Sequence, residues 1–199
     1  STYVDASSNV LRLDAQSGSD FDVTVTSTAL RSEASTSKPA FDCESYTVAA
    51  DVVTSTEDQL IVYHRNSDFG DKSYFRQTLA GQNIDTAEML AAVEDPFTNI
   101  TFGSVVTGEG LRAADAALTG QGLRSLHLAV GMAVLQDNSE SASAWLEAAR
   151  AQAKTTPALD THVAHWADFW ARSSVVLGSA AQRQTMCNDP AVTPPEAPW

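Results

Sequence analysis

The stretch Leu123–Leu135 constrains the fold most, because its side chains alternate between two kinds along its whole length. Alternation with a period of two predicts a β-strand. One face is apolar (Leu126, Leu128, Val130, Met132 and Val134), and the other is small or weakly polar (Ser125, His127, Ala129, Gly131 and Ala133). A strand with one large and one small face favours a central position in stacked sheets.

Similar alternation appears near the beginning of the chain. Asn9–Ala15 and Phe21–Thr26 are predicted to be half-buried strands. Ser17–Asp20 lies between them and is rich in turn-forming residues. These residues predict a turn that joins the two strands in a hairpin.

Three further segments are predicted to be strands. They are Tyr46–Val53, Gln59–Arg65 and Asn99–Val106. The last is interrupted by Gly103, which indicates a β-bulge or a close approach of two backbones.

Two segments have the features of amphipathic helices. Ser73–Gln82 is predicted to be a short helix capped by Ser73. Ser139–Lys154 is alanine-rich, begins with two candidate caps at Ser139 and Ser141, and places Trp145 on its inner side.

The densest aromatic cluster lies in Leu159–Leu177. Trp166, Phe169 and Trp170 share one face of a helix, because they are spaced by three and four residues. We interpret these rings as core. The β-branched segment Ser173–Leu177 is predicted to be a strand, so the stretch would join two packed bodies.

The order of these elements, strands first and helices near the end, predicts an antiparallel β-sandwich, complete or incomplete, followed by a short helical linker. We expect a sandwich portion over residues 1–136 and a helical linker with a returning strand over 137–178. Residues 179–199 are proline-rich and are expected to form an extended tail.

Charge excludes several classes of partner. The net charge is −13, which repels phosphate backbones and anionic membrane surfaces, so we expect neither nucleic acid nor a membrane as a partner. The sequence contains no apolar run long enough for a transmembrane helix. The low isoelectric point and the many serine and threonine residues favour a secreted protein. The chain does not begin with methionine, which indicates a processed or excised chain.

Few residues suggest covalent chemistry. Cys43 and Cys187 are either one disulfide or two buried thiols, and the sequence leaves both open. Asn99-Ile100-Thr101 is an N-glycosylation sequon, which matters only in a secreted protein. His162 and His165 are too few ligands for a metal, so we expect no metal and no cofactor.

Candidate contacts for a ligand are equally sparse. His64 and Arg65, at a strand end, could bind a sugar hydroxyl or a carboxylate, although a hydrogen-bond network at the strand end is the favoured interpretation. Trp145 is a third candidate sugar contact, because aromatic rings stack on sugars. No pair of carboxylates can be assigned as catalytic from spacing alone.

Short motifs distributed over residues 3–178 resemble family 95-type glycoside hydrolases, the α-L-fucosidase group. The pieces that resemble the amino-terminal β-sandwich of that family are Tyr3–Ala6, Tyr63–Asn66, Gln82, Asp95–Phe97, Thr101–Gly103 and Gly108–Gly110. His165–Ser173 resembles the segment that leads from that sandwich into an (α/α)6 catalytic barrel.

The resemblance implies a non-catalytic sandwich and linker of a larger secreted glycoside hydrolase-like protein. The chain begins inside that sandwich and ends where the barrel would begin, so no catalytic residue can be carried over. We therefore expect the chain alone to be inactive and to require a companion chain or a missing catalytic domain. The expected substrate of the assembly is carbohydrate.

Two other functions remain open. A stand-alone carbohydrate-binding, lectin-like sandwich would use exposed aromatic rings, with Trp145, Tyr74 and Trp199 as candidates. A sandwich from a polysaccharide lyase is less favoured, because lyases of acidic polymers need basic residues and this chain has 12 of them against 25 acidic ones.

Overall fold

The computed structural model describes residues 1–37, 46–66, 73–139, 141–156 and 158–173. The chain is mainly β, as predicted, and divides into two compact units, Ser1–Pro157 and Ala158–Trp199. The predicted boundaries at residues 136 and 178 stay predictions. The strands are β1 (Thr2–Val4), β2 (Val10–Thr26), β3 (Ser35–Ser37), β4 (Tyr46–Val48), β5 (Val52–Thr56), β6 (Gln59–Arg65), β7 (Ile100–Gly108), β8 (Arg112–Ala114) and β9 (Ala117–Gln136). The helices are α1 (Tyr74–Gly81), α2 (Thr86–Ala92), α3 (Ser143–Ala153) and α4 (Leu159–Arg172).

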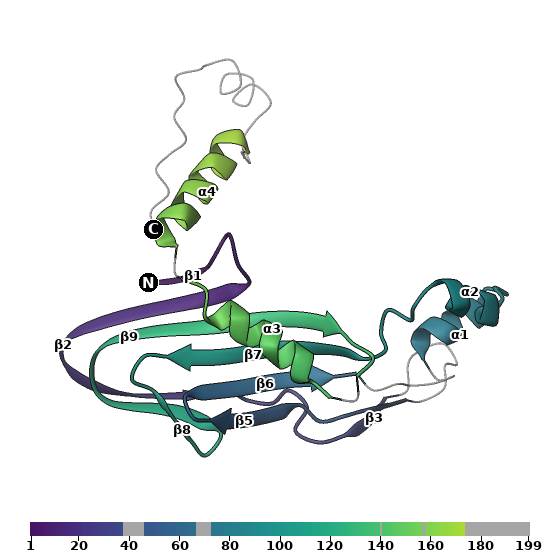
Figure 1. The fold of residues 1–199 in the computed structure, drawn as a ribbon, viewed down its shortest axis with the longest axis horizontal. Helices are drawn as coiled ribbons and strands as arrows, with labels where there is room; N and C mark the ends of the chain where they lie inside the picture. Colours follow the sequence, from purple (N-terminus) through teal and green to yellow (C-terminus); the bar gives the residue numbers. More distant parts are fainter. Residues whose placement is uncertain (38–45, 67–72, 140, 157, 174–199) are drawn as a thin grey trace, which may run out of the picture. The chain divides into compact units, whose positions relative to one another are not determined.

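One antiparallel sheet of seven strands dominates the first unit (Figure 1). Its order is β1-β2-β9-β7-β6-β5, and β8 pairs with β9 beside this path. Strands β3 and β4 form a separate two-stranded sheet. Strand β9 lies between β2 and β7, which confirms its predicted central position.

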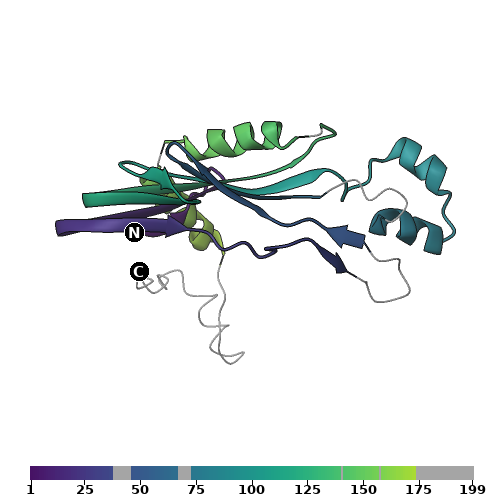
Figure 2. The same ribbon diagram turned by 90° about the horizontal axis from the view of Figure 1, so that it is seen from below.

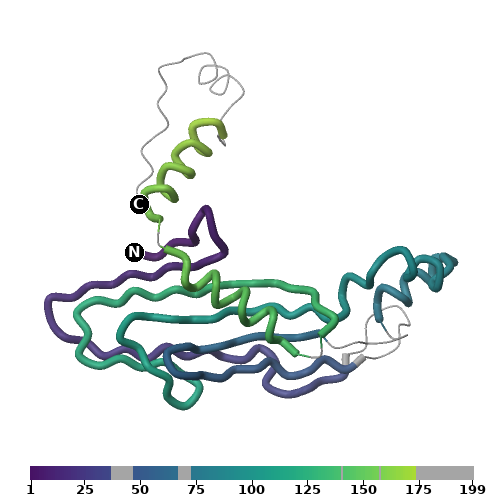
Figure 3. Tube along the Cα trace, in the orientation of Figure 1, coloured from purple at the N-terminus to yellow at the C-terminus, as the bar shows by residue number. Residues whose placement is uncertain are grey.

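Strands β2 and β9 are long, and they bend together so that the sheet curls over itself (Figure 3). Residues 10–16 of β2 pair with residues 125–131 of β9, and residues 21–26 pair with the start of β9, over residues 117–123. Ser17–Asp20 stands opposite Arg124 alone, which shifts the register. The predicted hairpin is therefore wrong: the polar residues form an irregular bend within one strand, because both halves keep the same partner.

The curl encloses the main core. Leu60 and Val106 face the interior from the main layer, and Leu118 faces it from the returning half of β9. The other buried members are Leu111, Leu126 and Leu128. This arrangement confirms the predicted sandwich-like fold. Strand β9 extends beyond the enclosed part, since Met132 and Val134 at its end are exposed.

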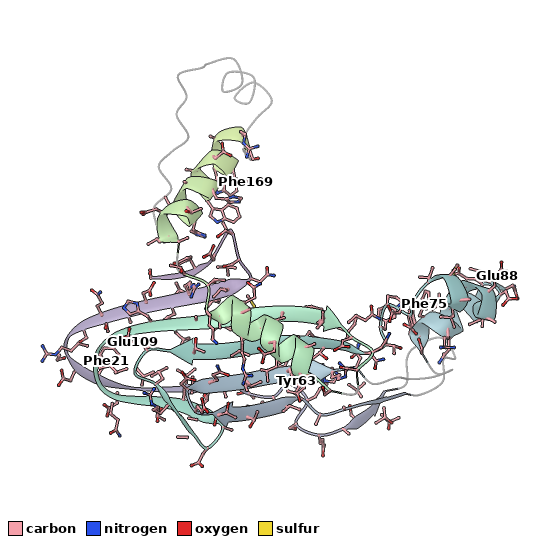
Figure 4. The ribbon with its side chains drawn as sticks, in the orientation of Figure 1. Phe21, Tyr63, Phe75, Glu88, Glu109 and Phe169 are labelled. Atoms are coloured by element: carbon pink, nitrogen blue, oxygen red, sulfur yellow. The ribbon has the colours of Figure 1, made fainter. Side chains whose placement is uncertain are left out.

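Helix α3 covers the other face of the sheet (Figure 2). The small residues of β9 make room for it, because an added Cβ at Gly131 would lie 2.3 Å from the backbone nitrogen of Ala153. Trp145 is only 1% exposed, and its indole nitrogen donates to the carbonyl oxygen of Ala133 at 2.8 Å. Its ring also contacts Tyr63, which Figure 4 shows close to α3. The predicted inner side of this helix is thus confirmed.

Gly103 allows a close approach of two strands. Strand β7 keeps its register through Gly103, which stands opposite Tyr63, so there is no bulge at this position. Its φ is +156°, and an added Cβ would lie 2.1 Å from the carbonyl oxygen of Val62.

The helix caps differ from the predictions. Ser73 precedes α1 but makes no cap hydrogen bond, because its hydroxyl donates to Asp95 instead. Helix α3 begins after Ala142 and has no side-chain cap, so the prediction of a cap at Ser139 or Ser141 is wrong. Helix α2 was not predicted, although Asp85 caps it by accepting from the backbone of Ala87 and Glu88.

Helix α4 is the part of the second unit that the structure describes, with one flanking residue at each end. Trp166, Phe169 and Trp170 are 40%, 38% and 48% exposed, so our interpretation of these rings as core is wrong (Figure 4 labels Phe169). Apart from Ser173, the predicted strand Ser173–Leu177 lies outside the described residues, as does the tail over 179–199. No helix within the described ranges combines the length and the apolar character that crossing a membrane requires.

Candidate functional site

Several motif segments meet at one end of the main sheet. The end of β6 lies beside the start of β7, since His64 stands opposite Phe102 and Arg65 opposite Thr101. The same end of β7 pairs with the end of β9, since Phe102 stands opposite Val134. The Asp95–Phe97 segment joins them through a hydrogen bond from the side chain of Asn66 to the carbonyl oxygen of Phe97.

His64 lies on the inner face of the sheet and is 4% exposed. Its Nδ1 is 3.0 Å from Oδ1 of Asp51 and 3.2 Å from Nε of Arg31. Arg31 also binds Asp51, with 2.8 Å between Nε and Oδ1. The imidazole is therefore part of a hydrogen-bond network at the strand end, the interpretation favoured from the sequence.

The protonation of this network follows from its surroundings. Burial and the charge of Arg31 lower the pKa of His64 below its ordinary value, although Asp51 acts in the opposite direction. Burial alone would raise the pKa of Asp51, but the hydrogen bonds and charge of Arg31, with the bond to His64, lower it overall. A neutral imidazole thus lies beside a paired carboxylate and guanidinium.

Arg65 lies on the opposite face of the sheet, where its guanidinium joins the ends of two strands. Nη1 donates to the hydroxyl of Thr101 at 2.6 Å, and Nη2 donates to the carbonyl oxygens of Asp137 and Ser139 at 2.8 and 2.5 Å. Nη1 also lies 3.4 Å from the carbonyl oxygen of Asn99. These bonds occupy donors that a sugar or carboxylate ligand would need.

Asp95 anchors the segment between α2 and β7. Its carboxylate accepts from the hydroxyl of Ser73 and, at 2.9 Å, from the backbone nitrogen of Phe97. Its carbonyl oxygen accepts from the side chain of Gln136 at 2.6 Å. Because Asp95 and Ser73 are both buried, this arrangement fixes the local backbone.

Trp145 does not lie at this surface. Its ring is enclosed between α3 and the sheet and presents no open face to a ligand. The proposal of Trp145 as a sugar contact is corrected on this ground: helix α3 uses its largest side chain to fill the small-residue face of β9. Exposed aromatic rings near the site include those of Tyr74 and Phe97, whose centroids are 6.2 Å apart in an edge-to-face arrangement.

Among the other predicted residues, Asn99 lies within the described part of the chain. It has a φ of +58°, and its side-chain nitrogen donates to the side-chain oxygen of Asn138 at 3.2 Å. The hydroxyl of Thr101, the third residue of the sequon, is buried and bound by Arg65, and glycosylation stays a prediction. Cys43, Cys187 and Trp199 lie outside the described residues.

Sequence reasoning missed a second buried polar cluster at the start of the chain. Arg12 is buried, and its Nη2 donates to the backbone carbonyl and hydroxyl of Thr155 at 2.5 and 2.9 Å. Asp5 is also buried, and the hydrogen bonds of Ser7 lower its pKa. A charged residue in an alternating strand is normally predicted to face solvent. The burial of Arg12 depends on its contact with Thr155, which follows α3, and this tertiary contact is not visible in the local sequence.

Two carboxylates near this end of the sheet are engaged in hydrogen bonds within the fold. Asp51 and Asp95 both accept hydrogen bonds from their own body. Within the described residues, no group of three or more histidine, cysteine or acidic side chains could hold a metal ion. Fold and site therefore define a β-sandwich-like module with appended helices.

The chain belongs to the family described as a domain of unknown function, DUF5703, whose model matches residues 1–175. This match covers all the strands of the first unit and the whole of α4. No curated protein and no solved structure matches the chain.

Proposed function

We propose that the chain is the non-catalytic sandwich and linker of a larger, secreted glycoside hydrolase-like protein, whose (α/α)6 catalytic barrel lies outside this chain. The observation that carries the proposal is the exposed aromatic face of α4. The proposal also includes a companion chain or domain that covers this face, and carbohydrate as the substrate of the assembly.

Within the described residues, the rings of α4 contact one another. Trp166 and Phe169 have centroids 5.4 Å apart, and Phe169 and Trp170 have centroids 5.0 Å apart, both edge to face. Leu159 and Val163 extend the same exposed apolar surface. An amphipathic helix with such a face is stable when the face packs on another body, which supports a linker that docks on a neighbouring domain.

The polar residues of the sandwich support a structural role. Glycoside hydrolysis requires two carboxyl groups on opposite sides of the scissile bond, one of them free to give a proton. Asp51 is held by Arg31, and Asp95 by Ser73 and a backbone nitrogen. These carboxylates stabilise the fold, so the proposal assigns catalysis to a different domain.

An activity assay tests this assignment. The 199-residue chain and its full-length parent protein are incubated with a panel of aryl glycosides at equal molar concentration. We expect hydrolysis by the parent alone. Hydrolysis by the 199-residue chain, or none by a folded parent on any glycoside of the panel, would contradict the proposal.

A second candidate function is carbohydrate binding by the sandwich itself. Tyr74 and Phe97 are both exposed, and the bonds of Asp95 and Asn66 fix the backbone of Phe97. Preorganised aromatic rings bind the apolar faces of sugars. A glycan array should then show hits that Tyr74→Ala abolishes and that Leu30→Ala, at another exposed apolar residue, leaves unchanged. An array without hits argues against this candidate.

A further inference from the structure

Arg31 and Asp51 tie two segments of the chain together. The backbone nitrogen of Asp51 donates to the carbonyl oxygen of Arg31 at 2.8 Å, and the backbone nitrogen of Arg31 donates to Oδ2 of Asp51 at 3.0 Å. The side chains add an ion pair of 2.8 Å. These bonds connect residues 27–34, through Arg31, to Asp51 immediately before β5, and we call this connected segment the strap.

His64 and Phe102 are the sheet residues that this strap contacts through Arg31 and Asp51. The neutral imidazole either accepts from Arg31 through Nδ1 or donates from Nδ1 to Asp51, at 3.2 and 3.0 Å. The ring of His64 lies 5.4 Å from that of Phe102, and the guanidinium carbon of Arg31 lies 5.9 Å from the Phe102 centroid. The strap therefore contacts the imidazole of His64 and the ring of Phe102.

We propose that the Arg31–Asp51–His64 cluster is a latch that acid releases, so that protonation of His64 frees residues 27–34 from the inner face of the sheet. A proton on His64 places a second positive charge beside Arg31 in a buried position. Asp51 already neutralises Arg31, and no other carboxylate in the described part of the chain is paired with this ring. This inference stands independently of the proposed function.

The direction of the effect follows from the surroundings of the ring. The charged groups next to it within the described ranges are Arg31 and Asp51, with Asn66 as a polar neighbour. Their combined effect with burial lowers the pKa of His64 from 6.5. The open state, in which the ring is solvated, binds a proton as the pH falls below 6.5, whereas the closed state stays neutral until its lower pKa.

His64 and Asp51 change protonation in different pH ranges, so their effects can be told apart. The pKa of Asp51 is lowered from 3.8, so this carboxylate stays ionised throughout the range in which the open state gains its proton. The equilibrium constant for opening of the strap should thus increase by at most about tenfold for each pH unit below pH 6.5, because the open state binds one additional proton.

Amide hydrogen exchange followed by NMR tests the latch on the intact chain. Protection factors, corrected for the intrinsic pH dependence of exchange, are measured for the amides of Arg31 and Asp51 at pH 7.5 and 5.5. We expect both to fall by up to about tenfold at pH 5.5. The paired amides of β7 and β9 should keep their protection.

Two variants make the test specific. His64→Gln removes the titrating group and should abolish the pH dependence. His127→Gln is the matched control, because His127 also binds an aspartate, Asp14 at 2.8 Å, but is 52% exposed. This control should retain the wild-type change.

A direct titration of the His64 ring by NMR keeps the inference testable if His64→Gln does not fold. A ring that stays neutral well below pH 6.5 while the two amides lose protection supports the latch. Protection of Arg31 and Asp51 that does not change with pH, or a change that persists in His64→Gln, would overturn it.

Discussion

Helices α3 and α4 both carry tryptophan on an apolar face, but they have opposite environments. Trp145 of α3 is 1% exposed and lies over small residues of β9, whereas Trp170 of α4 is 48% exposed. Helix α3 has a receiving surface, since the Gly131 position, with no Cβ, allows it to approach the sheet. The apolar face of α4 is exposed.

The comparison teaches that helical spacing of aromatic residues predicts an apolar face but not the surface that packs against this face. For α3 this surface could be predicted, because the sequence of the chain also contains the face of small residues on β9. For α4 the exposed apolar face itself is what supports a linker that docks on another domain.

The largest expected effect separates the two tryptophans. Trp145→Ala should lower the free energy of unfolding by about 3–5 kcal/mol, because it removes a buried ring and its hydrogen bond. Trp170→Ala should change it by less than about 0.5 kcal/mol, because the ring is exposed. Chemical denaturation of both variants measures this difference, and equal losses would break the comparison.

The next effect concerns the surface that receives α3. Gly131→Ala should destabilise the body by about 1–3 kcal/mol, since the new Cβ would meet backbone atoms of α3 that cannot move away easily. Gly18→Ala is the control, because open space surrounds Gly18. A neutral result at Gly131 would mean that α3 does not pack as closely as described.

Two arginine residues, one held by hydrogen bonds and one at an exposed ion pair, should also differ in their contribution to the free energy of unfolding. Arg65→Lys should cost about 2 kcal/mol, because an ammonium group cannot reproduce the forked bonds that join Thr101 to Asp137. Arg124→Lys, at an ion pair whose partners are 73% and 62% exposed, should cost less than about 0.5 kcal/mol. Thermal denaturation of the two variants, with the wild type beside them, measures both values.

The smallest effect is the pH dependence of stability. The lowered pKa of His64 stabilises the fold above pH 6.5, and this contribution is lost as the pH falls below that value, by no more than about 1.4 kcal/mol per unit. Denaturation of the wild type and His64→Gln between pH 7.5 and 5 should show a shallower decline in the variant. Parallel curves would mean that His64 titrates alike in the folded and unfolded chain.

The sequence predicts the longer strands well, because their alternation extends over enough residues to be recognised. Three-residue strands such as β3 and β8 are too short to show it, and the predicted strand Tyr46–Val53 is divided between β4 and β5, which pair with different partners. Gln59–Arg65 is a strand with the predicted limits, and the sandwich-like class is confirmed. The curl of β2 could not be predicted, because Ser17–Asp20 suits a hairpin turn as well as an irregular bend. Only the common partner β9 distinguishes the two.

The site was less predictable than the fold. Their position at a strand end identified His64 and Arg65, but the partners of His64, Asp51 and Arg31, approach from other segments through tertiary contacts. Burial of Arg12 depends on Thr155, which follows α3, far along the chain. Helix α2 had a signal that could have found it, since Asp85 followed by Glu88 is typical of a helix start.

Native mass spectrometry of the material as isolated, compared with the same sample denatured, tests the central claim most directly. We expect the native sample to contain a larger assembly that resolves into the 21.2 kDa chain and at least one companion chain, or to contain the chain within a longer parent. The double variant Trp166→Ser, Trp170→Ser should weaken association with a separate companion and should leave the folded body unchanged, because both rings are exposed. A folded 21.2 kDa monomer in both the native and the denatured spectra would contradict the account.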